Sequence, residues 1–85
     1  MCTYVTATLD VAGSAKGPAT WMRVTDASVY YDHPVHATAD HTLNVDLRRP
    51  EDGPGARVAV ELTAASARQL AETILRVLDD ADIPP

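Results

Sequence analysis

The sequence predicts an α+β fold, a four-stranded antiparallel meander with one C-terminal helix packed on one face. Apolar residues alternate with polar ones in four segments before residue 63, and after it they recur every three or four residues. The connections between the four segments are too short for helical crossovers, so successive strands should pair antiparallel. A chain of 85 residues suffices for one domain, and we expect residues 1–85 to form a single β-β-β-β-α domain.

The first two strands are predicted over residues 3–11 and 20–31. Residues 3–11 alternate strictly and are rich in β-branched side chains, which is typical of a half-buried strand. The run 13–18 contains two glycines and a proline and is expected to end that strand. In the second segment, residues 25–28 interrupt the alternation, which predicts a bulge or a short turn there.

The third and fourth strands are predicted over residues 41–48 and 56–62, where the alternation returns. The segment 32–40 between the second and third strands should be a loop, because Pro34 lacks a backbone donor. The segment 50–55 is rich in proline and glycine and should be a turn.

A helix is predicted from Ala64 to about Ala81, with Thr63 as its N-cap. A threonine hydroxyl at that position accepts a hydrogen bond from an amide of the first turn. If one face of the helix covers one face of the sheet, large apolar side chains from both should form the core. The expected core is Val5, Leu9, Leu43, Val45, Val58, Val60, Leu62, Leu70, Ile74 and Leu78.

The composition argues against nucleic acid and anionic membrane as partners. Seven Lys and Arg residues stand against twelve Asp and Glu, a formal net charge of −5, whereas a phosphate-binding protein carries a basic face. The single cysteine, Cys2, forms no internal disulfide, and residues 1–10 lack the pattern of a secretory signal. We therefore expect a cytoplasmic protein.

The size of the chain predicts self-association as a homodimer or a larger oligomer. A small domain with no Phe and one Trp has a limited core, and small cores are commonly completed by oligomerisation. The helix covers only one sheet face. The other face, which carries the polar side chains of the strands, is then solvent surface, the floor of a ligand site or a dimer contact.

All three histidines, His33, His36 and His41, lie within nine residues. Imidazoles grouped in this way supply ligands to Zn²⁺, Cu²⁺ or Ni²⁺ or act as a general acid and base. The alternative is that they are ordinary solvent-exposed side chains of a polar loop. We expect the three to converge, because His33 and His41 stand at opposite ends of one connection between neighbouring strands.

Four other residues are candidates for binding a small molecule. Tyr31, Asp32 and Asn44 are the expected neighbours of the histidines. The segment around Lys16 lacks the glycine and lysine spacing of a phosphate-binding loop and is interpreted as a hairpin connection, from which Lys16 can still reach an anionic ligand.

Two motifs carry a resemblance to a known family. The start Met-Cys-Thr-Tyr and the stretch Asp-His-Pro-Val-His-Ala at residues 32–37 resemble those of a family of small uncharacterised actinobacterial proteins, a domain of unknown function. The resemblance extends over nearly the whole chain. It implies a stand-alone cytosolic protein and brings no activity with it.

Two functions therefore remain in competition. In the first, a histidine cluster binds a metal ion or a small molecule, and the protein is a binding protein or a small enzyme. In the second, the chain is a non-catalytic interaction module that pairs through its open sheet face.

Overall fold

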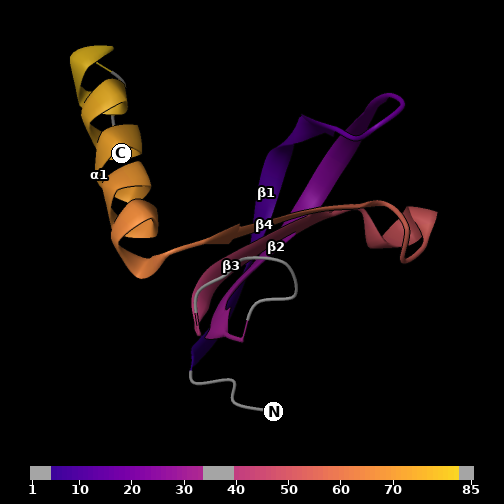
Figure 1. Cartoon of the computed structure of the whole chain (residues 1–85). Coiled ribbons are helices and arrows are strands. Elements are labelled where there is room, and N and C mark those ends of the chain that lie inside the picture. The colour runs from indigo at the N-terminus through magenta and orange to yellow at the C-terminus, as the bar shows by residue number, and fades with distance from the viewer. Residues whose placement is uncertain (1–4, 34–39, 83–85) are drawn as a thin grey trace.

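The computed structural model describes residues 5–33 and 40–82 and confirms the predicted fold (Figure 1). Four antiparallel strands form one sheet in the order β1-β2-β3-β4, and a single C-terminal helix, α1, packs against it. The elements are β1 (Val5–Lys16), β2 (Trp21–Asp32), β3 (Thr42–Arg48), the short 3-10 helix η1 (Pro50–Asp52), β4 (Arg57–Leu62) and α1 (Ala64–Asp80).

The strand register places like side chains side by side across the sheet. Because successive residues of a strand point to opposite faces, each set of paired residues belongs to one face. One face, here called the apolar face, carries three rows: Val5, Tyr31, Leu43 and Leu62; then Ala7, Val29, Val45 and Val60; then Leu9, Ala27, Leu47 and Val58. The opposite, polar face carries the rows Thr6, Tyr30, Asn44 and Glu61; Thr8, Ser28, Asp46 and Ala59; and Asp10, Asp26, Arg48 and Arg57.

The first hairpin is longer than predicted, and its irregularity lies in the other strand. β1 does not end near Gly13 but continues to Lys16, and the hairpin closes where the Gly17 amide donates to the Thr20 carbonyl at 2.8 Å. The register shifts between Asp10 and Gly13, so the bulge is in β1 and not in β2. Two residues of β1 face the single Thr25 there, so the side chains of β1 change faces at the bulge.

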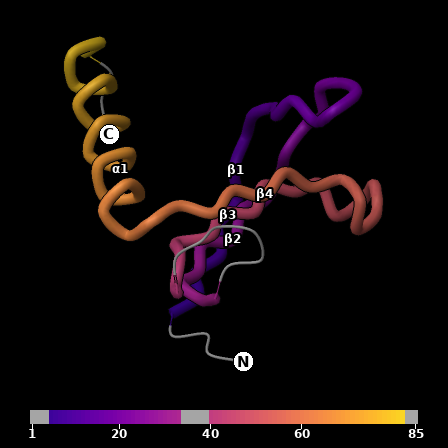
Figure 2. The backbone as a smooth tube through the Cα atoms, in the orientation of Figure 1, coloured from indigo at the N-terminus to yellow at the C-terminus, as the bar shows by residue number. Residues whose placement is uncertain are grey.

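The direction of α1 is set at a one-residue junction. Thr63 alone separates β4 from α1, with an extended backbone (φ −62°, ψ 154°). As predicted, it is the N-cap: its Oγ1 accepts from the Ser66 amide at 3.2 Å, and its carbonyl accepts from the Ala67 amide at 2.9 Å. The backbone traces show α1 turning sharply at the end of β4 and then extending away from the sheet (Figures 1 and 2).

The predicted core is wrong in most of its members. Within residues 5–33 and 40–82, only Val24 and Ala27 are buried apolar residues, and α1 has no buried residue. The half-buried members of the predicted core are Leu43, Val45, Val58 and Leu62, whereas Val5, Leu9, Val60, Leu70, Ile74 and Leu78 are exposed. The reason is geometric: α1 points away from the sheet (Figure 1), and its large apolar residues Leu70, Ile74 and Leu78 stay exposed.

The whole chain is correspondingly extended. It exposes 6458 Å², whereas folded monomers of 9.1 kDa expose about 4,900 Å². The radius of gyration is 14.0 Å, against about 12 Å for a compact domain of this length. The single chain therefore exposes about 1,500 Å² more than a compact monomer of its mass.

Loss of the N-cap should destabilise the protein measurably. Thr63→Ala removes the acceptor for the Ser66 amide and should lower the free energy of unfolding by about 1 kcal/mol, whereas Thr63→Ser keeps a hydroxyl and should lower it far less. Urea unfolding followed by circular dichroism measures both. Equal losses in the two variants would contradict the capping role.

Candidate functional site

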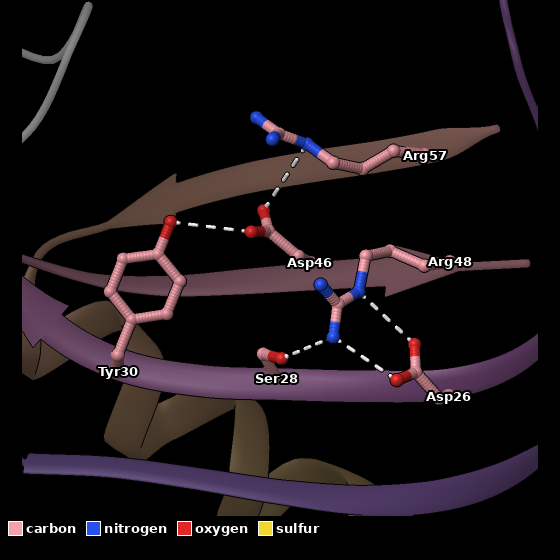
Figure 3. A network of polar contacts seen from close by, with 6 residues as sticks. All are labelled: Asp26, Ser28, Tyr30, Asp46, Arg48 and Arg57. Atoms are coloured by element: carbon pink, nitrogen blue, oxygen red, sulfur yellow. Dashed lines mark hydrogen bonds and ion pairs between the residues drawn. The ribbon is translucent and has the colours of Figure 1, made fainter. Parts of the chain in front are cut away.

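A network of charged and hydroxyl side chains crosses three strands on the polar face (Figure 3). Asp46 on β3 is its centre: its Oδ2 accepts a hydrogen bond from the Tyr30 hydroxyl at 3.3 Å, and its Oδ1 lies 3.8 Å from Nε of Arg57. Asp46 is buried, while Arg57 is half-exposed, so the carboxylate is held between a phenol from β2 and a guanidinium from β4.

A second group lies beside the first. Arg48 forms a bidentate ion pair with Asp26, at 3.1 Å from Nε and 3.0 Å from Nη2, and Nη2 also donates to Ser28 at 2.9 Å. Nearer the other end of β3, the Thr42 hydroxyl donates to Oδ1 of Asn44 at 2.7 Å. In the described part of the chain, every buried side-chain nitrogen or oxygen has a partner.

The Tyr30 hydroxyl titrates above its ordinary range. Burial is the largest cause, and the negative charge of Asp46 together with the hydrogen bond to it raises the pKa further. Arg57 acts in the opposite direction, and Asp32 adds a small increase. The phenol is therefore a hydrogen-bond donor at neutral pH, which suits it to hold Asp46 and makes it a poor general base.

These contacts give the polar face a structural role. Its buried groups are satisfied by one another, and Asn44, a predicted ligand-binding residue, is 4% exposed and already accepts from Thr42. The ion pairs with half-exposed partners each stabilise by at most about 1 kcal/mol. The bonds of Asp46 and Arg48 fix the register of β2, β3 and β4, because each of them joins β3 to a neighbouring strand.

Two of the three predicted metal ligands lie together. The rings of His33 and His41 have centroids 4.4 Å apart, and His41 stacks on Tyr31 with centroids 5.7 Å apart. Nδ1 of His33 lies 3.0 Å from the Asp40 carbonyl oxygen, which only accepts, so this bond places the proton on Nδ1 and leaves Nε2 free of one. His36 lies outside the described residues.

Of the other predicted site residues, Tyr31 and Asp32 lie beside the histidines, whereas Asn44 lies on the polar face bonded to Thr42. Asp32 is buried and its Oδ1 accepts from the His33 amide at 2.7 Å, so it shapes the start of the loop. Lys16 pairs with Trp21 at the opposite end of the twelve-residue strand β2. Among residues 5–33 and 40–82, no group of three His, Cys, Asp or Glu side chains is arranged to hold a metal ion.

An apolar groove of about 590 Å³ lies between the sheet and α1. Its size falls in the usual range of binding clefts. Its walls are mostly apolar, and only the Tyr31, Arg68 and Glu72 side chains bring polar atoms. The groove is lined by Val29, Tyr31, Leu43, Ala64, Ala67, Arg68, Ala71, Glu72 and Leu75.

The most apolar side of α1 does not line this groove. A helix turns by about 100° per residue, so the side centred on Ile74 is rotated about a quarter turn from the side formed by Ala64, Ala71 and Leu75. We call the exposed residues of that side the helix stripe; they are Leu70, Ile74, Val77 and Leu78, between 43% and 56% exposed. The protein thus has a half-open groove and, beside it, an uncovered apolar stripe.

Sequence reasoning missed the groove for an identifiable reason. The heptad-like spacing of Leu70, Ile74, Val77 and Leu78 marked the stripe as the sheet-facing side. Ala64, Ala67 and Ala71 form a second line of small side chains along the helix, and this line allows the close approach to the sheet. That alanine line was the available signal.

The fold and the groove define a small α+β chain with an open apolar groove. The chain belongs to a family of unknown function (DUF6295), which matches residues 1–84. No significant match was found among curated proteins or among solved structures. Within the described residues, no helix has the length and hydropathy needed to cross a membrane.

The titration of Tyr30 tests the polar network. Asp46→Asn removes a negative charge beside the hydroxyl and should lower its pKa toward 10, while Asp26→Asn, on the same face but paired with Arg48, should leave it unchanged. Ultraviolet absorbance titration measures the phenol, assigned by its loss in Tyr30→Phe.

The same shift gives a pH dependence of stability with a defined sign. The folded chain keeps the Tyr30 proton to higher pH than the unfolded chain, so the free energy of unfolding should fall as pH rises above about 10. This fall should be weaker in Asp46→Asn. An unchanged pH profile in that variant would refute the assigned coupling.

Proposed function

We propose that this protein is a non-catalytic interaction module that assembles with a second copy of itself through its apolar surfaces. One observation carries the proposal: the apolar face of the sheet and the helix stripe are both exposed, including Leu9, Val60, Leu70 and Ile74. Monomeric proteins rarely leave contiguous apolar surfaces of this extent in water.

The uncovered area fits a permanent dimer. The chain exposes 6458 Å², about 1,500 Å² more than a compact monomer of its mass. If each of two copies buried that excess, the interface would total about 3,000 Å², within the range of obligate homodimers. An area of this size is larger than transient contacts require.

The charges beside the groove suit a symmetric partner. Arg68 and Glu72, of opposite sign, line the groove one helical turn apart. In a two-fold interface each contact occurs twice. If Arg68 of one copy lies beside the partner's Glu72, then Glu72 of the first copy lies beside the partner's Arg68. This self-complementarity supports a second copy as the occupant.

We propose that this assembly forms in the cytoplasm of an actinobacterium. The single cysteine and the acidic composition favour the cytoplasm, and the Asp-His-Pro-Val-His-Ala stretch favours an actinobacterial source. Neither nucleic acid nor a membrane surface is expected as a partner, because the net charge is −5.

The oligomeric state is the direct test. At tens of micromolar the chain should sediment at twice 9.1 kDa or more. Ile74→Asp places a charge in the centre of the helix stripe and should weaken association by at least about 2 kcal/mol, roughly 30-fold. Sedimentation equilibrium measures both quantities.

A matched control separates the interface from helix propensity. Gln69→Asp places the same residue type in the same helix but on its opposite side, where the side chain is exposed. It should leave the dimer intact. A 9.1 kDa wild-type species, or equal weakening by the two variants, would count against the proposal.

A second candidate function is metal binding at the histidines. The observation that favours it is the His33 and His41 pair, with the bond to Asp40 leaving Nε2 of His33 available as a ligand atom. A backbone carbonyl on the other ring nitrogen commonly orients metal-binding histidines in this way. Such a site would take Zn²⁺, Cu²⁺ or Ni²⁺, with His36 as the third predicted ligand.

Metal titration tests this candidate independently of assembly. His33→Ala and His41→Ala should each abolish Zn²⁺ binding measured by calorimetry, while Lys16→Ala, at the other end of β2, should not. Metal binding needs neutral imidazole, so the affinity should decrease on acidification. Undiminished binding in His33→Ala and His41→Ala, or no binding by the wild-type chain, would exclude a histidine site.

A further inference from the structure

We infer that the two copies pair by exchange, with the helix stripe of each copy seated on the apolar face of its partner's sheet. This inference rests on the proposed self-association and adds its geometry. The target is the row farthest from the origin of α1, here called the far row: Leu9, Ala27, Leu47 and Val58.

The junction at Thr63 prevents the chain from covering this row by itself. The single linking residue is extended, and its side chain and carbonyl both hold amides of the first helical turn. With one extended residue between the two elements, α1 starts at the end of β4 and leads away from the sheet (Figure 1). The capped geometry therefore directs the helix stripe outward, to a surface that belongs to another chain.

The helix of the same chain reaches only the near part of the apolar face. The sheet residues that line the groove with α1 are Val29, Tyr31 and Leu43, which belong to the first two rows. No residue of the far row lines the groove, and Leu9 in that row is 50% exposed. In the rest of the far row Leu47 and Val58 are half-buried and Ala27 is buried between its neighbours, so each copy presents a row exposed mainly at Leu9 and an exposed helix stripe.

Reciprocal exchange covers both surfaces at once. In a two-fold dimer the stripe of the first copy lies on the far row of the second, and the second returns the same contact. Pairing of helix with helix would bury both stripes but leave both far rows in water. A foreign partner would need to present a helix stripe and an apolar sheet face together, which a second copy does by construction.

Cross-linking between two different single-cysteine variants tests the exchange. The native cysteine is removed by Cys2→Ser, and a copy with Leu9→Cys is mixed with a copy carrying Ile74→Cys before addition of a short bifunctional maleimide. The mixture should form a covalent dimer of twice 9.1 kDa, well above the amount that either variant forms alone. A second pair, Val58→Cys with Ile74→Cys, repeats the test should Leu9→Cys fail to fold.

Two controls fix the faces that meet. Thr8→Cys, on the polar face beside Leu9, should not cross-link to Ile74→Cys, and Gln69→Cys, on the opposite side of α1, should not cross-link to Leu9→Cys. Cross-linking of Ile74→Cys mainly with itself would overturn the exchange in favour of helix pairing.

Sedimentation of the same samples distinguishes a failure of the exchange from a failure of self-association. A dimer that lacks the cross-link between Leu9→Cys and Ile74→Cys overturns the exchange and leaves self-association standing. A 9.1 kDa monomer at tens of micromolar overturns self-association, and the exchange with it.

Discussion

The capped junction at Thr63 is the constraint on which the rest of the structure depends. One residue joins β4 to α1, and its hydroxyl and carbonyl bind the Ser66 and Ala67 amides. A longer linker would let the helix lie along the sheet and form an ordinary core. The short, capped linker instead holds α1 at the sheet by its first turns, which opens the groove and leaves the helix stripe in water.

The two faces of the sheet have exchanged their expected roles. The polar face contains the most buried side chains of β3, with Thr42 at 0% and Asn44 at 4% exposure, and its charges are paired within the chain. The apolar face is the open one. A sheet whose buried polar groups are already satisfied has little left to offer a polar ligand on that side.

The sequence predicts the strands and the helix well because those signals are local. Alternation located β2, β3 and β4 to within about one residue, and Thr63 was identifiable as a cap from its position alone. The bulge of β1 was missed because the interrupted alternation at residues 25–28 was assigned to β2, whereas the extra residue lies in β1 opposite Thr25. The direction of α1 was not predicted, for a different reason. An apolar stripe on a helix predicts that this side packs against another surface, but it does not identify that surface.

The same distinction applies to the site. The adjacency of His33 and His41 followed from their places at the two ends of one loop, whereas Lys16 was assigned by residue type and lies at the far end of β2. The groove depends on the angle between α1 and the sheet, which no residue pattern encodes by itself. Tyr31 links the two regions, because its ring stacks on His41 and also lines the groove. A partner that fills the groove through Tyr31 therefore contacts a ring in direct stacking contact with the histidine pair, so assembly and any chemistry of the histidines share one side chain.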